Sequence, residues 1–209
     1  MRLILLGVPG SGKGTQGAIL SSQWQIPHIS TGEILRQAIA NQTALGLKAK
    51  AYVEKSELVP DYLIFDLIRQ RLTTPSTQRG WILDGFPGNL SQAQFLDQLL
   101  ATLGQSYNRV FSFYVPTDVL VQRWRQRGRS DDHPELIYKR IEVYQEQTAP
   151  VIQHYRQQGC LTVINGDRPV EIVTHFLQSS FSDLSLTIHQ KTVNTSKRLI
   201  NQEPQILSD

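Results

Sequence analysis

Residues 7–15 read GVPGSGKGT and directly follow the apolar run LILL of residues 3–6. A short, fully apolar run that ends at a glycine is typical of a strand buried on both faces of a parallel sheet. In the loop, glycines let the backbone curl so that consecutive N–H groups face the oxygens of a phosphate, and the helix expected to begin near Thr15 adds the positive end of its dipole. Lys13 supplies a mobile cation that can follow charge onto a phosphoryl group. The stretch therefore predicts a strand, a phosphate-binding loop and a helix.

The loop differs from the strict Walker pattern at one position. That pattern has Ser or Thr directly after the lysine, whereas here Gly14 intervenes and the hydroxyl belongs to Thr15. The alternative interpretation is an ordinary glycine-rich turn. Four glycines with a lysine and a threonine at fixed places arise by chance on the order of once in 10^5 chains, taking glycine at about 7% of residues. We therefore favour the phosphate-binding loop.

Three further apolar runs are bounded by Gly, Asn or Pro, and they cover residues 81–83, 110–115 and 161–164. Helical periodicity lies between them, over residues 90–103 and 137–152. Strands that alternate with helices predict an α/β fold with a central parallel sheet and helices on both faces.

Two segments do not follow this alternation. Residues 31–72 hold helical patterns that are broken at Thr43 and Pro60, without an apolar strand, and we interpret them as a helical insert on the sheet. Residues 181–209 have mixed polar composition, balanced charge and no clear period, which is typical of a tail or a loosely docked extension. The sequence predicts no role for this tail.

Composition excludes several classes of protein. The 209 residues suffice for one α/β domain or at most two small ones, and no apolar run approaches the length of a membrane span. Lys and Arg exceed Asp and Glu by 21 to 18, which is too little for a nucleic-acid coat but compatible with a local anion site. Cys160 is alone, so an intramolecular disulfide and a cysteine-clustered zinc site are excluded. We expect a cytoplasmic protein, because the run at residues 3–6 does not continue into a signal-peptide cleavage region.

Four separated blocks together resemble the adenylate kinase family: the loop of residues 7–15, ISTGEILR at 29–36, LDGFP at 83–87 and RGRSDD at 127–132. The resemblance spans residues 1 to about 178. It implies reversible transfer of the γ-phosphoryl group of ATP to AMP, giving two ADP, with Mg²⁺ as cofactor and with nucleotides as the partners of a monomer.

The resemblance also implies a P-loop three-layer α/β fold over residues 1–180. A helical insert at about residues 30–59 would bind the monophosphate, and a short lid would cover about residues 125–134. Only Gly128 separates Arg127 from Arg129, so the chain resembles the members without a long lid insert or a zinc finger. Closure over both nucleotides is expected, because water must leave before the transfer.

On the ATP side, the resemblance implies that the loop holds the phosphates, with Lys13 as the principal cation. The loop residues are Gly10, Ser11, Gly12, Lys13, Gly14 and Thr15. Arg123 and Arg127 match arginines on this side, and the backbone at Arg168 would contact the ATP adenine. Asp84 matches the carboxylate that organises Mg²⁺ through water, so no direct protein ligand of the metal is expected.

On the AMP side, Thr31 and Gln92 match the adenine contacts, and Arg36 matches an arginine that binds the phosphate. Backbone stretches that line this pocket are expected at Glu57, Leu58, Val59, Gly85 and Phe86. Arg129 and Arg140 match arginines that close on the phosphates. The implied catalytic set is Lys13, Arg123, Arg127, Arg129 and Arg140.

Charge in the region of these arginines supports the resemblance on physical grounds. Between residues 122 and 140 lie six basic side chains and three acidic ones: Arg123, Arg125, Arg127, Arg129, Lys139 and Arg140 against Asp131, Asp132 and Glu135. Phosphoryl transfer needs two polyanions held in line with their repulsion neutralised. The alternative is a solvated helix face. Asp131 and Asp132 either orient the arginines or cap the following helix.

The chain departs from the family at Gly88. In the family, an arginine follows the GFP motif and binds the AMP phosphate. In this chain, Pro87 is followed by Gly88 and Asn89 instead. A lost charged hydrogen bond costs about 1.5–3 kcal/mol. Three interpretations follow: an adenylate kinase with weakened or compensated AMP binding, which we favour, a kinase for another monophosphate, or an ATP-binding regulatory module. A switch GTPase is disfavoured, because no Asn-Lys-x-Asp motif occurs.

The histidines and tryptophans carry no motif. The five histidines lack metal-like spacing, and we expect none to be catalytic. The three tryptophans are expected to pack in the core rather than to stack on bases.

Overall fold

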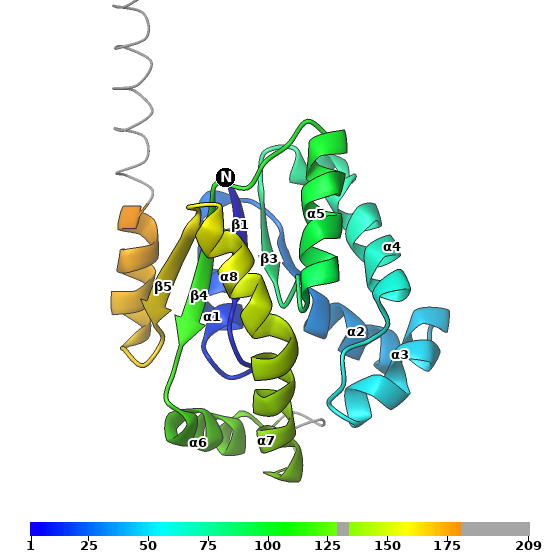
Figure 1. Ribbon diagram of the computed structural model, residues 1–209, viewed down its shortest axis with the longest axis vertical. Helices are drawn as coiled ribbons and strands as arrows, with labels where there is room; N and C mark the ends of the chain where they lie inside the picture. Colours follow the sequence, from blue (N-terminus) through cyan, green and yellow to red (C-terminus); the bar gives the residue numbers. More distant parts are fainter. Residues whose placement is uncertain (129–133, 181–209) are drawn as a thin grey trace, which may run out of the picture. The chain divides into compact units, whose positions relative to one another are not determined.

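A computed structural model describes residues 1–128 and 134–180 of the chain. Its centre is a five-stranded sheet in the order β2-β3-β1-β4-β5, and every neighbouring pair is parallel (Figure 1). The strands are β1 (Arg2–Leu6), β2 (His28–Ser30), β3 (Trp81–Asp84), β4 (Arg109–Tyr114) and β5 (Leu161–Asn165). The predicted α/β fold with a central parallel sheet is confirmed.

The helices between the strands cover both faces of the sheet. They are α1 (Lys13–Trp24), α2 (Thr31–Ala40), α3 (Ala44–Glu54), α4 (Asp61–Leu72), α5 (Leu90–Thr102), α6 (Thr117–Arg127), α7 (Pro134–Val143) and α8 (Ala149–Gln157). A short 3-10 turn occupies Pro75–Thr77, and a π-helical turn at Tyr144–Thr148 joins α7 to α8. In Figure 1, α5 and α8 lie on one face and α1 on the other, as a three-layer fold requires.

The core explains why the run LILL forms a central strand. Leu3, Ile4, Leu5 and Leu6 are 0–2% exposed, because helices cover both sides of β1. Ile4 and Leu6 belong to the same apolar cluster as Leu96 of α5 and Val151 of α8. Each such side chain stabilises the fold by about 1.5–3 kcal/mol relative to exposure.

The segment of residues 31–72, predicted to be helical, is helical in the structure. It consists of α2, α3 and α4, and the two predicted breaks lie at its helix boundaries. The Thr43 hydroxyl caps α3 by accepting a hydrogen bond of 3.1 Å from the Gly46 N–H, and Pro60 directly precedes α4. A Cβ on Gly46 would lie 2.0 Å from the Ala38 carbonyl oxygen, so α2 and α3 pack at a distance that only glycine permits.

Strand β2 was not predicted. It has only three residues, and just Ile29 is buried, so it lacks the continuous apolar run of the other strands. It forms because its backbone pairs with β3 at the edge of the sheet, where Ile29 lies beside Leu83. This pairing is a long-range contact that the local sequence does not indicate.

The chain divides into two compact units, residues 1–168 and residues 169–209. In the second unit the structure describes residues 169–180, and residues 170–180 are helical. The tail of residues 181–209 lies outside the described residues, as do Arg129, Asp131 and Asp132 of the predicted lid. No helix among the described residues has the length and hydrophobicity needed to cross a bilayer.

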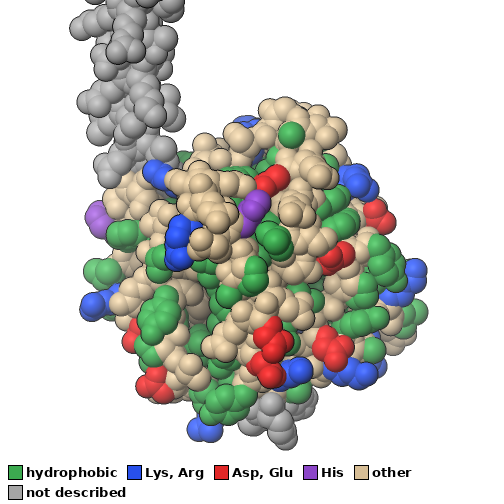
Figure 2. Space-filling model, in the orientation of Figure 1, with side chains coloured by type: hydrophobic (Ala, Val, Ile, Leu, Met, Phe, Trp, Pro, Cys, Tyr) green, Lys and Arg blue, Asp and Glu red, His purple; other side chains and the backbone are tan. Residues whose placement is uncertain are grey.

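The surface drawn in Figure 2 carries no continuous basic area. On the face shown, Lys and Arg side chains are interspersed with Asp and Glu. This mixture of signs is consistent with the small net charge of +3.

Candidate active site

The parallel sheet brings the predicted site residues to one edge. All five strands run in the same direction, so their carboxyl ends meet where ligands bind in open α/β sheets. Asp84, the last residue of β3, pairs with Leu5 of β1 on one side and with Ser30 of β2 on the other. The phosphate loop and Thr31 directly follow these two neighbours. Segments that are far apart in the sequence, at residues 5, 30 and 84, therefore meet at Asp84.

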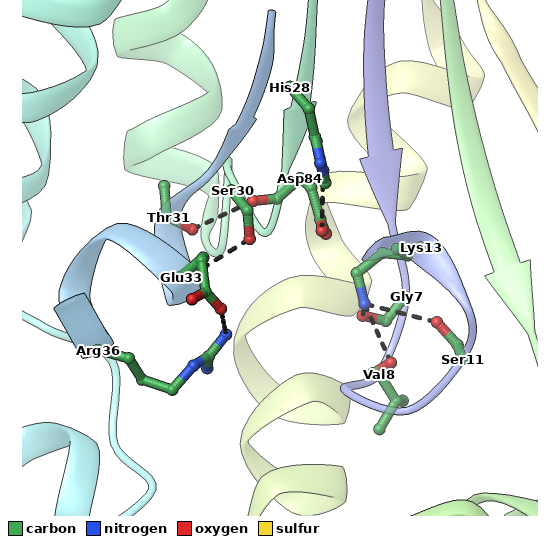
Figure 3. A network of polar contacts seen from close by, with 10 residues as sticks. All are labelled: Gly7, Val8, Ser11, Lys13, His28, Ser30, Thr31, Glu33, Arg36 and Asp84. Atoms are coloured by element: carbon green, nitrogen blue, oxygen red, sulfur yellow. Dashed lines mark hydrogen bonds and ion pairs between the residues drawn. The ribbon is translucent and has the colours of Figure 1, made fainter. Parts of the chain in front are cut away.

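Lys13 lies inside the curl of the phosphate loop (Figure 3). It is the first residue of α1 and only 8% exposed, and its Nζ donates to the carbonyl oxygens of Gly7 at 2.6 Å and Val8 at 3.0 Å. A third contact reaches the Ser11 Oγ at 3.4 Å. A phosphate oxygen is a stronger partner for this ammonium than neutral oxygens are. Gly14 and Thr15 are exposed in the first turn of α1.

Gly10 and Trp124 approach one another too closely for any other residue at position 10. Gly10 has φ +88°, and a Cβ there would lie 2.4 Å from the Trp124 Nε1. The same Nε1 donates a 2.6 Å hydrogen bond to the Pro9 carbonyl oxygen. Trp124 is 1% exposed, so the expectation that it packs in the core is confirmed. The phosphate loop is thus held against α6.

The two predicted arginines Arg127 and Arg140 meet at the Trp124 ring. Their guanidinium carbons lie 5.0 Å and 4.9 Å from the ring centroid, within cation–π distance. Arg140 also donates from Nε to the Ser56 Oγ at 3.0 Å, so it links α7 to the helical insert. Trp124 therefore lies between the phosphate loop and two arginines. Sequence reasoning missed this arrangement, because a single tryptophan carries no positional signal.

Arg123 faces the loop that follows β5. Its Nη1 donates to the Gly166 carbonyl oxygen at 2.9 Å, and its Nη2 lies 3.5 Å from the Asp167 Oδ1. The side chain thereby fixes the loop that also holds Arg168, whose own side chain is exposed. This places the two predicted ATP-side segments together.

Asp84 is a buried carboxylate that lies close to His28 and is influenced by the charge of Lys13. Its Oδ2 lies 3.4 Å from the His28 Nε2, and it is 7% exposed (Figure 3). Burial raises its pKa, but the contact with His28 and the charge of Lys13 outweigh burial and hold the pKa of Asp84 below its ordinary value. The carboxylate is therefore ionised at neutral pH. A Cβ on Gly14 would lie 3.5 Å from the same Oδ2, so the carboxylate faces the start of α1.

The donor set suits Mg²⁺ bound mainly to a nucleotide. Among residues 1–128 and 134–180, no three His, Cys, Asp or Glu side chains gather as a metal site. Mg²⁺ keeps several waters and is commonly bound through one or two carboxylates together with substrate phosphates. One ionised carboxylate beside a phosphate loop fits that mode of binding.

On the acceptor side, Arg36 and Thr31 lie near the ends of β2 and β3. The Arg36 Nη2 donates to the Glu33 Oε2 at 2.9 Å, one helical turn earlier in α2. The Thr31 Oγ1 donates to the Asp84 carbonyl oxygen at 3.3 Å. A Cβ on Gly85 would lie 2.8 Å from that Oγ1, and Gly85 has φ +80°, so glycine is required there.

The remaining predicted acceptor residues form the wall of this region. Phe86 and Val59 are buried at 0% and 5% exposure, whereas Glu57 is exposed and Leu58 is half-buried. Gln92, on the first turn of α5, is 3% exposed. Its Oε1 accepts from the Gly88 N–H at 2.6 Å.

Gly88 is confined on both sides. Its carbonyl oxygen accepts a 2.7 Å hydrogen bond from the Thr148 Oγ1, at the end of the π-helical turn. A Cβ at position 88 would lie 3.3 Å from the Leu58 Cδ1 and 3.3 Å from the Gln92 Oε1. The backbone permits a side chain, but Leu58 occupies part of the space that it needs.

Comparisons with known proteins point to one family of enzymes. The family model for adenylate kinase matches residues 5–160. Adenylate kinase 1 of Nostoc sp. (strain PCC 7120) is 51% identical over 179 residues, covering 86% of this chain and 97% of that protein. Adenylate kinase 1 of Synechocystis sp. (strain PCC 6803) is 51% identical over 176 residues, covering 84% and 94%. Adenylate kinase of Xylella fastidiosa (strain 9a5c) is 49% identical over 170 residues, covering 79% and 91%.

Proposed function

The chain belongs to the adenylate kinase family, which transfers a phosphoryl group reversibly from ATP to AMP to give two ADP, and we propose that the residues at the carboxyl edge of the sheet perform this transfer. We assign these roles mainly because Lys13, Asp84 and Thr31 lie together at the ends of three neighbouring strands. Each strand end contributes one function: a phosphate cation, a metal-organising carboxylate and an acceptor contact.

On the ATP side, the loop from Gly10 to Thr15 would bind the phosphates. Lys13 exchanges neutral carbonyl partners for phosphate oxygens and follows charge onto the transferring group. Arg123 and Arg127 neutralise further charge, and the backbone at Arg168 would lie against the adenine. The cation–π contact with the Trp124 ring holds Arg127 in position.

On the acceptor side, Thr31 and Gln92 would contact the adenine of AMP and Arg36 its phosphate. Segments 57–59 and 85–86 would form the wall of the pocket. Arg140 lies between the two sides, because it touches both Ser56 of the insert and Trp124 behind the phosphate loop. It would stabilise the charge shared by the two nucleotides, together with Arg129, which lies outside the described residues.

The reaction needs no general base on the chain. The acceptor oxygen belongs to a phosphate that is already anionic at neutral pH, so the work of the protein is alignment, charge neutralisation and exclusion of water. Asp84 would hold Mg²⁺ through water. When bound, the metal supplies neutralisation of charge on the ATP phosphates.

A panel of acceptors tests the proposed function. We expect coupled assays with ATP and AMP to give the highest kcat/KM, and UMP, CMP and GMP to give much lower values. A preference for another monophosphate would contradict the proposed adenine contacts. Retained ATP binding without turnover of any acceptor would favour a regulatory module instead.

Replacing Gly88 by arginine tests the departure from the family. We expect Gly88→Arg to raise kcat/KM for AMP about tenfold, because a charged hydrogen bond to the phosphate is worth about 1.5–3 kcal/mol. Part of that gain is lost to contact with Leu58, 3.3 Å from the position of the new Cβ. The KM for ATP should change little. Steady-state kinetics with each substrate varied in turn measure both.

Two matched variants separate charge from bulk. Gly88→Met adds the bulk without the charge and should not raise kcat/KM. Adding Leu58→Ala to Gly88→Arg makes room for the side chain and should increase the gain. An unchanged value in both arginine variants would mean that another cation already replaces the missing one.

We further propose that the enzyme acts as a monomer in the cytoplasm. All of the proposed site residues belong to one chain, so a second copy is not needed to complete the site. A single cysteine suits a reducing compartment. Light scattering that gives the mass of one chain, 23.7 kDa, would support the monomer, and twice that mass would contradict it.

A further inference from the structure

The Gln92 amide is held by contacts at both of its polar atoms. Its Oε1 accepts from the Gly88 N–H at 2.6 Å, and its Nε2 donates to the Asp61 Oδ1 at 2.8 Å. Gln92 is 3% exposed, so water does not compete with these two bonds. A buried amide with partners at both ends has one permitted orientation if those partners differ in kind.

The two partners of Gln92 do differ in kind. The Gly88 N–H can only donate, and a carboxylate can only accept. A rotation of the amide by 180° would place Nε2 against the N–H and Oε1 against the carboxylate. Both contacts would then be repulsive, and two buried polar groups would lose their hydrogen bonds. The chemistry of the neighbours therefore fixes which side of Gln92 presents oxygen and which presents nitrogen.

Asp61 is the member of this network that comes from another helix. It is the first residue of α4, and its Oδ1 accepts from both the Gln92 Nε2 and the Asn89 Nδ2, the latter at 3.0 Å. Asn89 in turn caps α5, because its Oδ1 accepts from the Gln92 N–H at 2.8 Å. Asp61, Asn89 and Gln92 thus form a closed ring of hydrogen bonds. The ring holds both the backbone and the side chain of Gln92.

Within the part of the chain that the structure describes, these two bonds leave one acceptor position on Oε1 and one proton on Nε2 for a ligand. Adenine presents an amino donor beside a ring nitrogen acceptor, which matches an oxygen and an N–H side by side. Guanine and hypoxanthine present the reverse pair, a carbonyl oxygen beside a ring N–H. A glutamine that could rotate would serve either pair, whereas an amide fixed in this orientation serves adenine alone.

We propose that Asp61 is a positioning residue that makes the acceptor site selective for adenine by holding the Gln92 amide in one orientation. The proposal rests on the proposed contact between Gln92 and the acceptor base. Asp61 itself does not touch the base. It acts through the hydrogen bond that determines how Gln92 faces the ligand.

The test compares AMP with IMP as acceptor, because the two differ in the atoms that a fixed amide distinguishes. With ATP saturating, we expect Asp61→Ala to raise the KM for AMP about tenfold, as loss of one charged hydrogen bond implies. The kcat and the KM for ATP should stay within about twofold of the wild-type values. The preference for AMP over IMP should fall at least about tenfold.

Three further variants make the result specific. Asp61→Asn keeps an acceptor oxygen and should retain most of the preference for AMP, and a loss as large as that of the alanine variant would overturn the proposal. Asp66→Ala removes an exposed carboxylate from the same helix, where Asp66 pairs with Arg69 at 3.2 Å, and it should leave the preference for AMP unchanged. If Asp61→Ala does not fold, Asp61→Ser takes its place, because serine keeps a polar side chain in the first turn of α4 but is too short to reach Gln92.

An unchanged preference for AMP in a folded Asp61→Ala would overturn the proposal. Gln92→Ala distinguishes this failure from failure of the underlying function. If Gln92→Ala loses the preference for AMP over IMP while Asp61→Ala keeps it, Gln92 distinguishes the two bases without help from Asp61. If Gln92→Ala also keeps the preference, the proposed contact between Gln92 and the base is itself wrong.

Discussion

Lys13→Met is expected to lower kcat about a thousandfold, which is the effect of removing a principal donor aimed at developing charge. The side chain is buried in the curl of the loop, and its ammonium lies 2.6 Å and 3.0 Å from two carbonyl oxygens of that loop. Methionine retains the length and apolar body of the side chain but cannot donate to a phosphoryl oxygen. The KM for AMP should change far less than kcat. A coupled assay with each nucleotide varied in turn measures the difference.

Lys48→Met is the matched control for this prediction. Lys48 is exposed on α3 and belongs to none of the proposed phosphate contacts. Its replacement should leave kcat unchanged, and circular dichroism should report the same fold for both variants. A Lys13→Met enzyme that keeps more than about a tenth of the wild-type kcat would contradict the assigned role.

Asp84→Asn is expected to lower kcat about a hundredfold and to weaken the coupling between Mg²⁺ and ATP binding. The amide is similar in size but carries no charge, so the attraction of Asp84 to the charge of Lys13 is lost. Calorimetric titration of ATP with and without Mg²⁺ measures the coupling. In the wild type Mg²⁺ should tighten ATP binding, and in the variant this benefit should be largely lost. An equal benefit in both proteins would mean that Asp84 does not organise the metal.

Stability should depend on pH through the same carboxyl group. The pKa of Asp84 is lower in the folded protein than its ordinary value, so its ionised form stabilises the fold at pH values above about 3.9, the usual aspartate pKa. This stabilisation is lost as the pH falls through the lower folded pKa. Urea unfolding of the wild type and Asp84→Asn between pH 7 and pH 3 should therefore give a difference in unfolding free energy that shrinks toward acid. A constant difference would contradict an ionised Asp84.

Much of the fold could be predicted from the sequence, because four of the strands carry their own signal. Residues 3–6, 81–83, 110–115 and 161–164 are apolar runs, and each forms a strand of the parallel sheet. The first two are fully buried, whereas 161–164 forms the edge strand β5, where Val163 is 55% exposed. Such runs depend on local composition alone. Strand β2 could not be predicted, because its three residues become a strand only through pairing with β3.

Part of the candidate site could likewise be predicted from the sequence, and part could not. The phosphate loop has a fixed local pattern, and the sequence indicated Lys13 and its helix directly. Trp124, Asp61 and Thr148 carry no such pattern, yet each contacts a site segment far away in sequence: Pro9, Gln92 and Gly88, respectively. Their importance depends on distances that only the folded chain defines. The role of Arg129 stays a prediction, since it lies outside the described residues.

Transfer of a labelled γ-phosphoryl group tests the central claim most directly. The account requires two nucleotides to be held together, with water excluded, so that one phosphate attacks another. With γ-labelled ATP and excess AMP, single-turnover quenching should place the label in the β position of the newly formed ADP, with almost none in inorganic phosphate. Label released mainly as inorganic phosphate, at the same rate with and without AMP, would contradict direct transfer between two bound nucleotides.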